Sequence, residues 1–193
     1  MNRRLISAVI ISVFVVATAG VVIAEFIDKS KVLGASFSVG SADIKLLKDL
    51  SLGTELINLV DDTPGPGFNN IGPNWSADYL MKIFNNGTSK VTVKSHANYS
   101  TSNDPDSLRD VIYAEIFAWS DLNSNGIVDP GEKGNSMGAP KTILRWKNDA
   151  DGIILGEIES GQVKAYIVTF STLDLSSTKQ GKSGMFDFEF ESA

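Results

Sequence analysis

The fold class is decided by the stretch YLMKIFNNGTSKVTVKSH, residues 79–96. Two runs rich in β-branched and aromatic residues, 79–84 and 91–96, flank Asn85-Asn86-Gly87-Thr88. Asn-Gly between two such runs is the strongest short-range signal for a β-hairpin. The stretch therefore predicts two antiparallel strands joined by a tight turn.

Similar short runs recur along the rest of the chain, separated by turns rich in Gly, Asn and Pro. Helical periodicity is weak, and one helical turn is expected near residues 106–109. About seven to nine short strands of this kind predict an all-β fold, a β-sandwich or barrel, as a single domain over residues 36–193. The further predicted strands are 36–39, 44–46, 111–119, 142–147, 153–158, 163–170 and 185–191, and the last places Phe186, Phe188 and Phe190 on one face.

The first 24 residues have the parts of a secretory signal peptide. Arg3 and Arg4 supply a positive start, residues 5–24 carry no charge, and the small or short apolar residues Val22 and Ala24 occupy the −3 and −1 positions of a cleavage site. The alternative is an uncleaved membrane anchor, because about 20 apolar residues also span a bilayer. In both cases we expect the domain to lie outside the cell.

Composition narrows the possible functions. Removal of residues 1–24 would change the formal net charge from −6 to −8, which argues against nucleic acid as a partner. The chain has no cysteine, which excludes disulfides, thiol catalysis and cysteine-based metal sites. A secreted domain without disulfides must be held by its core, by a metal or by assembly with neighbours.

One motif has a specific chemical meaning. Residues 121–132, DLNSNGIVDPGE, match the calcium-loop pattern D-x-N-x-N-G-x-x-D-x-x-E. A calcium ion takes six to eight oxygen ligands, and a glycine at the sixth position permits the sharp turn that lets them converge. The predicted metal ligands are Asp121, Asn123, Asn125, Ile127 through its carbonyl, Asp129 and Glu132.

The sequence around this loop argues against a calcium sensor. A regulatory EF-hand has a helix on each side, whereas this loop follows the predicted strand 111–119 and contains Pro130-Gly131. The prediction is structural calcium that stabilises an extracellular loop. The alternative is a polar turn between two strands that binds no metal.

We expect no catalytic site. His96 is the only histidine, so it cannot form H-E-x-x-H or any multi-histidine zinc site. No G-x-S-x-G elbow, P-loop or dinucleotide fingerprint is present. A secreted metalloprotease is therefore the weakest of the functional readings.

Four features in sequence order resemble the TasA/camelysin family of exported proteins. They are the acidic-aromatic start after the signal, residues 25–31; the small and apolar first strand, 35–44; the strand that ends in Asn-Asn-Gly-Thr, 82–88; and Gln180-Gly181-Lys182-Ser183 before the alternating strand 186–191. Together they span nearly the whole chain.

The resemblance implies a jelly-roll domain that polymerises into extracellular fibres of a biofilm matrix. It also implies a dedicated signal peptidase as a transient partner and self-association as the lasting one. In such fibres the N-terminal segment of one subunit completes a sheet of the next by donor-strand exchange, and Glu25–Ala35 is the candidate donor. The alternative function is a cell-surface-anchored binding module or adhesin.

Overall fold

The computed structural model describes residues 39–192, so the predicted signal segment, 1–24, and the predicted donor segment, 25–35, lie outside the described residues. The described chain is mostly β-sheet with little helix, as predicted. Its strands are β1 (Ile44–Leu47), β2 (Leu59–Val60), β3 (Ser76–Asn85), β4 (Val91–Asn98), β5 (Ile112–Trp119), β6 (Lys133–Ser136), β7 (Lys141–Thr142), β8 (Ile153–Ile158), β9 (Val163–Thr172) and β10 (Asp187–Ser192). The helical turns are η1 (Leu56–Asn58), η2 (Thr101–Asn103), η3 (Leu108–Asp110), α2 (Ile143–Asn148) and η4 (Ser177–Lys179).

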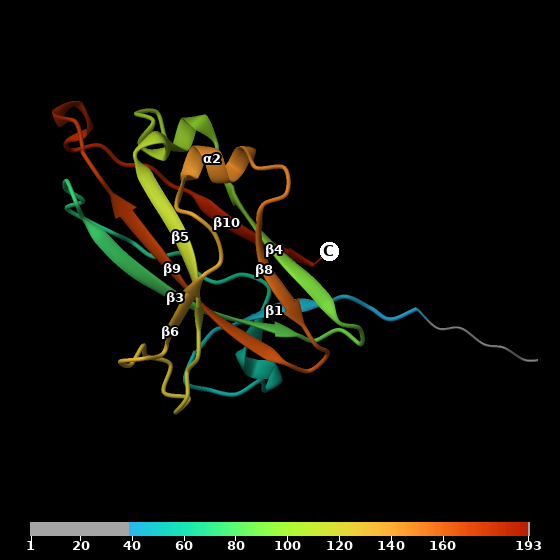
Figure 1. The fold of residues 1–193 in the computed structure, drawn as a ribbon. Coiled ribbons are helices and arrows are strands. Elements are labelled where there is room, and N and C mark those ends of the chain that lie inside the picture. The colour runs from blue at the N-terminus through green and yellow to red at the C-terminus, as the bar shows by residue number, and fades with distance from the viewer. Residues whose placement is uncertain (1–38, 193) are drawn as a thin grey trace, which may run out of the picture. The chain divides into compact units, whose positions relative to one another are not determined.

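Two antiparallel sheets make up the domain (Figure 1). The larger has the order β2-β1-β3-β9-β5-β6, with β7 also paired to β5, and the smaller has the order β10-β4-β8. From β3 onward the chain crosses from one sheet to the other at β3–β4, β4–β5, β7–β8, β8–β9 and β9–β10. Segments far apart in sequence therefore become neighbours.

The core lies between the two sheets. Alternate residues of β3, β4, β5, β8 and β9 face it, as expected for strands that bury one side. Trp146 of α2 is fully buried there, donates from Nε1 to the Ser95 carbonyl oxygen at 2.9 Å, and stacks on Phe188 of β10 with 5.1 Å between ring centroids. Phe186, Phe188 and Phe190 are half-buried and pack against this core, as the alternation of the last strand predicts.

The predicted hairpin at residues 79–96 is wrong. β3 pairs with β1 and β9, whereas β4 pairs with β10 and β8 in the other sheet. Gly87 is required for a close approach, since an added Cβ would meet the Ser41 carbonyl oxygen at 2.4 Å. The N–H groups of Asn86 and Gly87 donate to the Asp43 carbonyl, so the turn is closed by the segment before β1 and carries the chain across the sandwich.

The predicted strand 142–147 is also wrong. Thr142 ends β7 and its side-chain oxygen accepts the N–H of Arg145, which caps the short helix α2. Ile143 and Trp146 lie three residues apart, one helical turn, and both are buried in the core. Their burial selects helix over strand here.

Most other strand predictions are confirmed, at 44–46, 111–119, 153–158, 163–170 and 185–191, with small shifts at the ends. Of the predicted strand 36–39, only Val39 is described, and it lies in no strand. The described strands number ten, above the predicted seven to nine, because β6 and the two-residue strands β2 and β7 were not predicted as strands of their own. Within residues 39–192, no helix is long and apolar enough to cross a membrane.

Candidate functional site: an open groove beside β10 and a calcium-type loop

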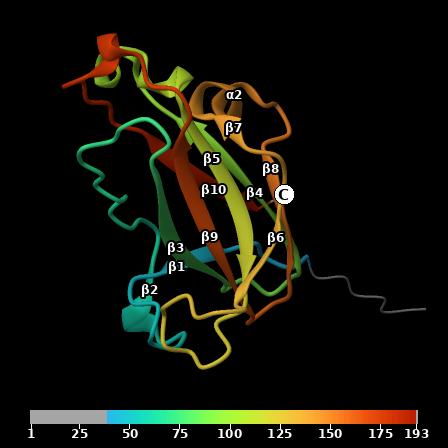
Figure 2. The ribbon, with the colours of Figure 1, turned by 60° about the vertical axis from the view of Figure 1, so that its left-hand side comes forward.

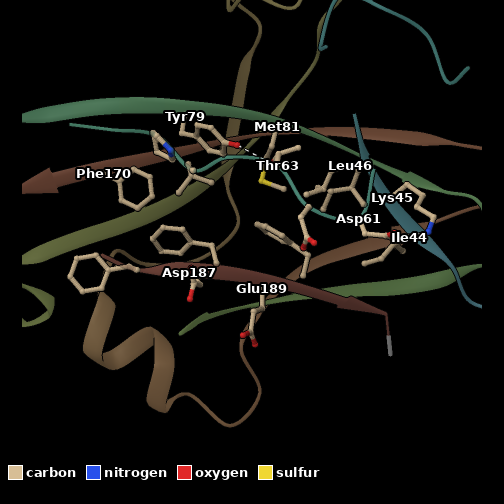
Figure 3. A pocket seen from close by; sticks show the side chains of 18 residues that line it. Ile44, Lys45, Leu46, Asp61, Thr63, Tyr79, Met81, Phe170, Asp187 and Glu189 are labelled. Atoms are coloured by element: carbon tan, nitrogen blue, oxygen red, sulfur yellow. Dashed lines mark hydrogen bonds and ion pairs between the residues drawn. The ribbon is translucent and has the colours of Figure 1, made fainter. Parts of the chain in front are cut away.

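An apolar groove of about 580 Å³ opens between the larger sheet and the strand β10 (Figure 3). We call it the β10 groove. Its walls come from the inner faces of β1, β3 and β9, from the phenylalanines of β10, and from residues 61–66 of the segment between β2 and β3 (Figure 2). Its apolar lining residues are Ile44, Leu46, Met81, Ile83, Val168, Phe170, Phe186, Phe188 and Phe190.

The groove exists because the two sheets differ in width. β10 is the edge strand of the smaller sheet and pairs only with β4 among the described strands. A further strand beside β10 would lie over β1 and β3, whose residues Ile44, Leu46 and Met81 line the groove instead. The unpaired side of β10 thus combines main-chain hydrogen-bonding groups with an apolar surface next to it.

Acidic residues dominate the polar lining of the groove. Asp61 and Asp62 line it, and so do Asp187 and Glu189 of β10, whose side chains Figure 3 shows on the face of that strand away from Met81. Lys45 is the only basic lining residue among the described positions. Lys45 Nζ contacts Asp61 at 2.6 Å and Asp43 at 3.2 Å. The hydrogen bond to Asp61, followed by that to Asp43, raises the pKa of Lys45. The ammonium group therefore stays protonated, and its charge is already paired with two carboxylates.

The predicted calcium loop, residues 121–132, connects β5 to β6. The Asp121 carboxylate accepts N–H groups of Asn125 at 3.1 Å and Gly126 at 3.0 Å. Asn125 Oδ1 accepts the N–H of Ile127 at 2.8 Å, and Asp129 Oδ2 accepts from Nδ2 of both Asn123 and Asn125, at 2.8 and 2.9 Å. These five predicted ligands therefore lie in one connected hydrogen-bond network.

Glu132, the sixth predicted ligand, closes the loop at its far end. Its carboxylate accepts N–H groups of Leu122 at 2.9 Å and Asp129 at 3.0 Å, and also the indole N–H of Trp119 at 3.2 Å. The hydrogen bond from the Asp129 backbone is the largest cause that lowers the pKa of Glu132, and burial opposes it. The carboxylate is therefore held ionised where a cation would need it.

A buried lysine lies against the first ligand. Lys82 alternates with Met81 and Ile83 on β3 and so points to the outer face of the larger sheet. Its Nζ donates to Asp121 Oδ2 and to the Leu50 carbonyl oxygen, each at 2.6 Å, and lies 5.2 Å from the Trp119 ring centroid. Burial raises the pKa of Asp121, but the hydrogen bonds from Lys82 and Gly126 outweigh it and leave that pKa below its ordinary value.

The donor set partly fits a calcium ion. Side-chain oxygens of Asp121, Asn123, Asn125 and Asp129 are brought close, and these are oxygen ligands of the kind that calcium takes. In this conformation the two asparagines direct Nδ2 toward Asp129, so binding requires their amide oxygens to turn inward. Among residues 39–192, no three His, Asp or Glu side chains form a metal-binding cluster on their own.

His96 lies on β4, half-buried, on the outer face of the smaller sheet. Its Nε2 is 3.3 Å from Glu191 Oε1 on β10. This is a cross-strand pair, and the residue belongs neither to the groove wall nor to the calcium loop.

Two features of the site escape sequence reasoning. The first is the groove, which no local pattern encodes because it depends on which strand lies at an edge. The second is Lys82, which sits 39 residues before Asp121 in a strand whose other outward residues include Leu80 and Phe84. A charged residue inside a strongly apolar strand was the available signal.

Comparison of the chain with known protein families and with curated proteins finds no match.

Proposed function

We propose that this protein is an exported structural subunit that polymerises into an extracellular filament, with the β10 groove as the acceptor for the N-terminal segment of the next copy. The observation that supports the proposal most directly is that β10, which pairs on one side only among the described strands, borders a groove with apolar walls. An extended segment placed there would satisfy main-chain groups of β10 and cover the apolar wall at the same time.

The occupant is the segment Glu25–Ala35 of a second copy, freed when the signal peptidase removes residues 1–24. Eleven extended residues span about 36 Å, longer than the six residues of β10, which extend about 20 Å. Each copy has one donor segment and one groove, so the contact is head-to-tail and does not close on itself. Such a contact propagates a filament.

The jelly-roll reading of the sandwich belongs to this proposal, as does the location outside the cell. The repeated crossing of the chain between two antiparallel sheets is compatible with that topology. Calcium at Asp121–Glu132 would stabilise the loop between β5 and β6. It would thus supply stability that disulfides cannot give to a chain without cysteine.

Electron microscopy of the exported chain tests the proposal directly. We expect filaments from the chain that starts at Glu25 and none from a chain that lacks residues 25–35. A labelled peptide of residues 25–35 should bind the shortened chain, since its groove is vacant. Monomers at high concentration from both chains, with calcium present, would refute the proposal.

A substitution in the groove wall supplies a second test of the proposal. Leu46→Asp places a charge on a partly buried wall residue beneath the docked strand and should block assembly. The control is Ile154→Asp, since Ile154 is half-exposed on β8, at the edge of the smaller sheet opposite β10. If both variants assemble like the wild type, the groove is not the acceptor.

A further inference from the structure

A ladder of carboxylates follows the outward face of β10. Asp187, Glu189 and Glu191 alternate with the phenylalanines and are exposed. Figure 3 shows Asp187 and Glu189 on the side of β10 that faces away from Met81 and Phe170. The ladder is thus presented on the outer surface, at the edge where a new strand would be added.

The strand on the other side of the ladder is basic or polar at the matching positions. β4 places Asn98, His96 and Lys94 opposite Asp187, Glu189 and Glu191. Asn98 donates to Glu189 at 2.8 Å, and His96 lies 3.3 Å from Glu191. Asp187 pairs with Asn98 through the sheet, but its carboxylate has no hydrogen-bond or ion-pair partner among residues 39–192. The carboxylates of β10 therefore have polar or basic neighbours on the β4 side only.

We propose that this ladder sets the register of the incoming segment by pairing with Lys29 and Lys31 of the second copy. The inference rests on the proposed function. Lys29 and Lys31 are two residues apart, which is the spacing of the carboxylates along β10. Side chains on one face of neighbouring strands are close enough for opposite charges to attract, whether the strands run parallel or antiparallel.

The same register directs suitable side chains into the groove. With Lys29 and Lys31 outward, Phe26 and Val32 face the apolar wall. Asp28 and Ser30 share that face, where the groove offers the hydroxyl of Thr63, while Lys45 is already paired with Asp61 and Asp43.

A shift by one residue would reverse every side chain of the segment. Ile27 and Leu33 would then enter the groove, but Lys29 and Lys31 would enter with them. Two ammonium groups would lie against Ile44, Leu46 and Met81, which carries a desolvation cost. Asp61 and Asp62 also line the groove, but Asp61 is already paired with Lys45, so at most one carboxylate is available for the two lysines. Charge on β10 and apolarity in the groove thus favour the same register.

Charge reversal on each partner tests the inference. The donor variant is Lys29→Glu with Lys31→Glu, the acceptor variant is Asp187→Lys with Glu189→Lys, and the swap combines all four. All are exported as full chains and compared with the wild type by sedimentation at low and high salt. Each single-side variant should raise the concentration needed for assembly on the order of tenfold at low salt, and the swap should restore it.

The control variant is Glu157→Lys with Glu159→Lys, which changes the net charge equally at the far edge of the smaller sheet. It should assemble like the wild type at matched salt. Equal inhibition by the control, or no rescue in the swap, would overturn the charge pairing while leaving the filament proposal intact.

A peptide experiment separates the two proposals. A labelled peptide of residues 25–35 and its Lys29→Glu, Lys31→Glu form are added to the full chain and to its acceptor variant. The wild-type peptide should prefer the wild-type chain, and the reversed peptide the acceptor variant. Binding without this exchange of preference would overturn the register inference alone. Failure of both chains to bind either peptide or to polymerise would overturn both proposals.

Discussion

Replacement of Lys82 by methionine should destabilise the domain strongly. The Lys82 and Asp121 side chains are about 10% and 4% exposed, and 2.6 Å separates Nζ from Oδ2. Methionine leaves the buried Asp121 carboxylate without its cation and removes the donor to the Leu50 carbonyl oxygen. Loss of one partner of a buried ion pair costs about 3–5 kcal/mol. That is a large fraction of the roughly 5–15 kcal/mol by which such domains are stable.

Urea titration followed by tryptophan fluorescence measures this loss, with the dependence on urea unchanged if unfolding stays two-state. The matched control is Lys90→Met. Lys90 pairs with Glu157 at 2.7 Å, but the two side chains are 46% and 58% exposed, so solvent screens the pair and the expected loss is small. The double variant Lys82→Met with Asp121→Leu should recover much of the stability, because no unpaired buried charge remains. A loss for Lys82→Met no larger than that for Lys90→Met would refute the reasoning.

Three further predictions concern the loop 121–132. Chelation of calcium should lower the melting temperature of the wild-type protein. In Asn123→Ala, which keeps the Lys82–Asp121 pair, chelation should lower the melting temperature less. Equal shifts in the wild type and the variant would mean that the loop is only a turn. Gly126→Ala should lower the free energy of unfolding more than Gly131→Ala. Both glycines have a positive φ, 73° and 93°, but only at Gly126 would an added Cβ meet backbone, at 2.8 Å. Equal losses of stability in urea would contradict this close approach. The pKa values of Asp121 and Glu132 lie below their ordinary values of 3.8 and 4.5. These two carboxylates therefore add their full stabilisation at a pH above the ordinary values, and the stabilisation is lost as the pH falls through the lowered pKa values. Glu132→Gln should therefore show a smaller loss of stability in acid than the wild type, and an unchanged acid dependence would argue against this source.

Local patterns predicted much of the fold correctly. The strands β5, β8, β9 and β10 were readable because each alternates or concentrates apolar residues over a full strand length. The loop 121–132 was readable because its six predicted ligands lie within twelve residues and its hydrogen bonds are local. In such segments the sequence neighbours are also the spatial neighbours.

Predictions failed where distant segments decided the conformation. The turn at 85–88 has the composition of a hairpin, yet hydrogen bonds from Asn86 and Gly87 to Asp43 hold it as a crossing between sheets. The segment 142–147 has β-branched and aromatic residues, yet burial of Ile143 and Trp146 on one side makes it helical. In both segments tertiary contacts outweigh weak local preferences.

The sequence by itself thus determined the β class, the strand positions along most of the chain and a compact polar loop at 121–132, because each depends on side-chain periodicity or on spacing within a short segment. Calcium binding by that loop stays a prediction. Only the tertiary structure decided which strand lies at an edge, where the groove opens and what Lys82 contacts. Strand order depends on the sum of packing contacts between segments far apart in sequence, and the unpaired side of β10 is defined by the strands that are not beside it in the described domain. The alternation of Phe186, Phe188 and Phe190 with carboxylates was visible in the sequence, but its position beside a groove was not.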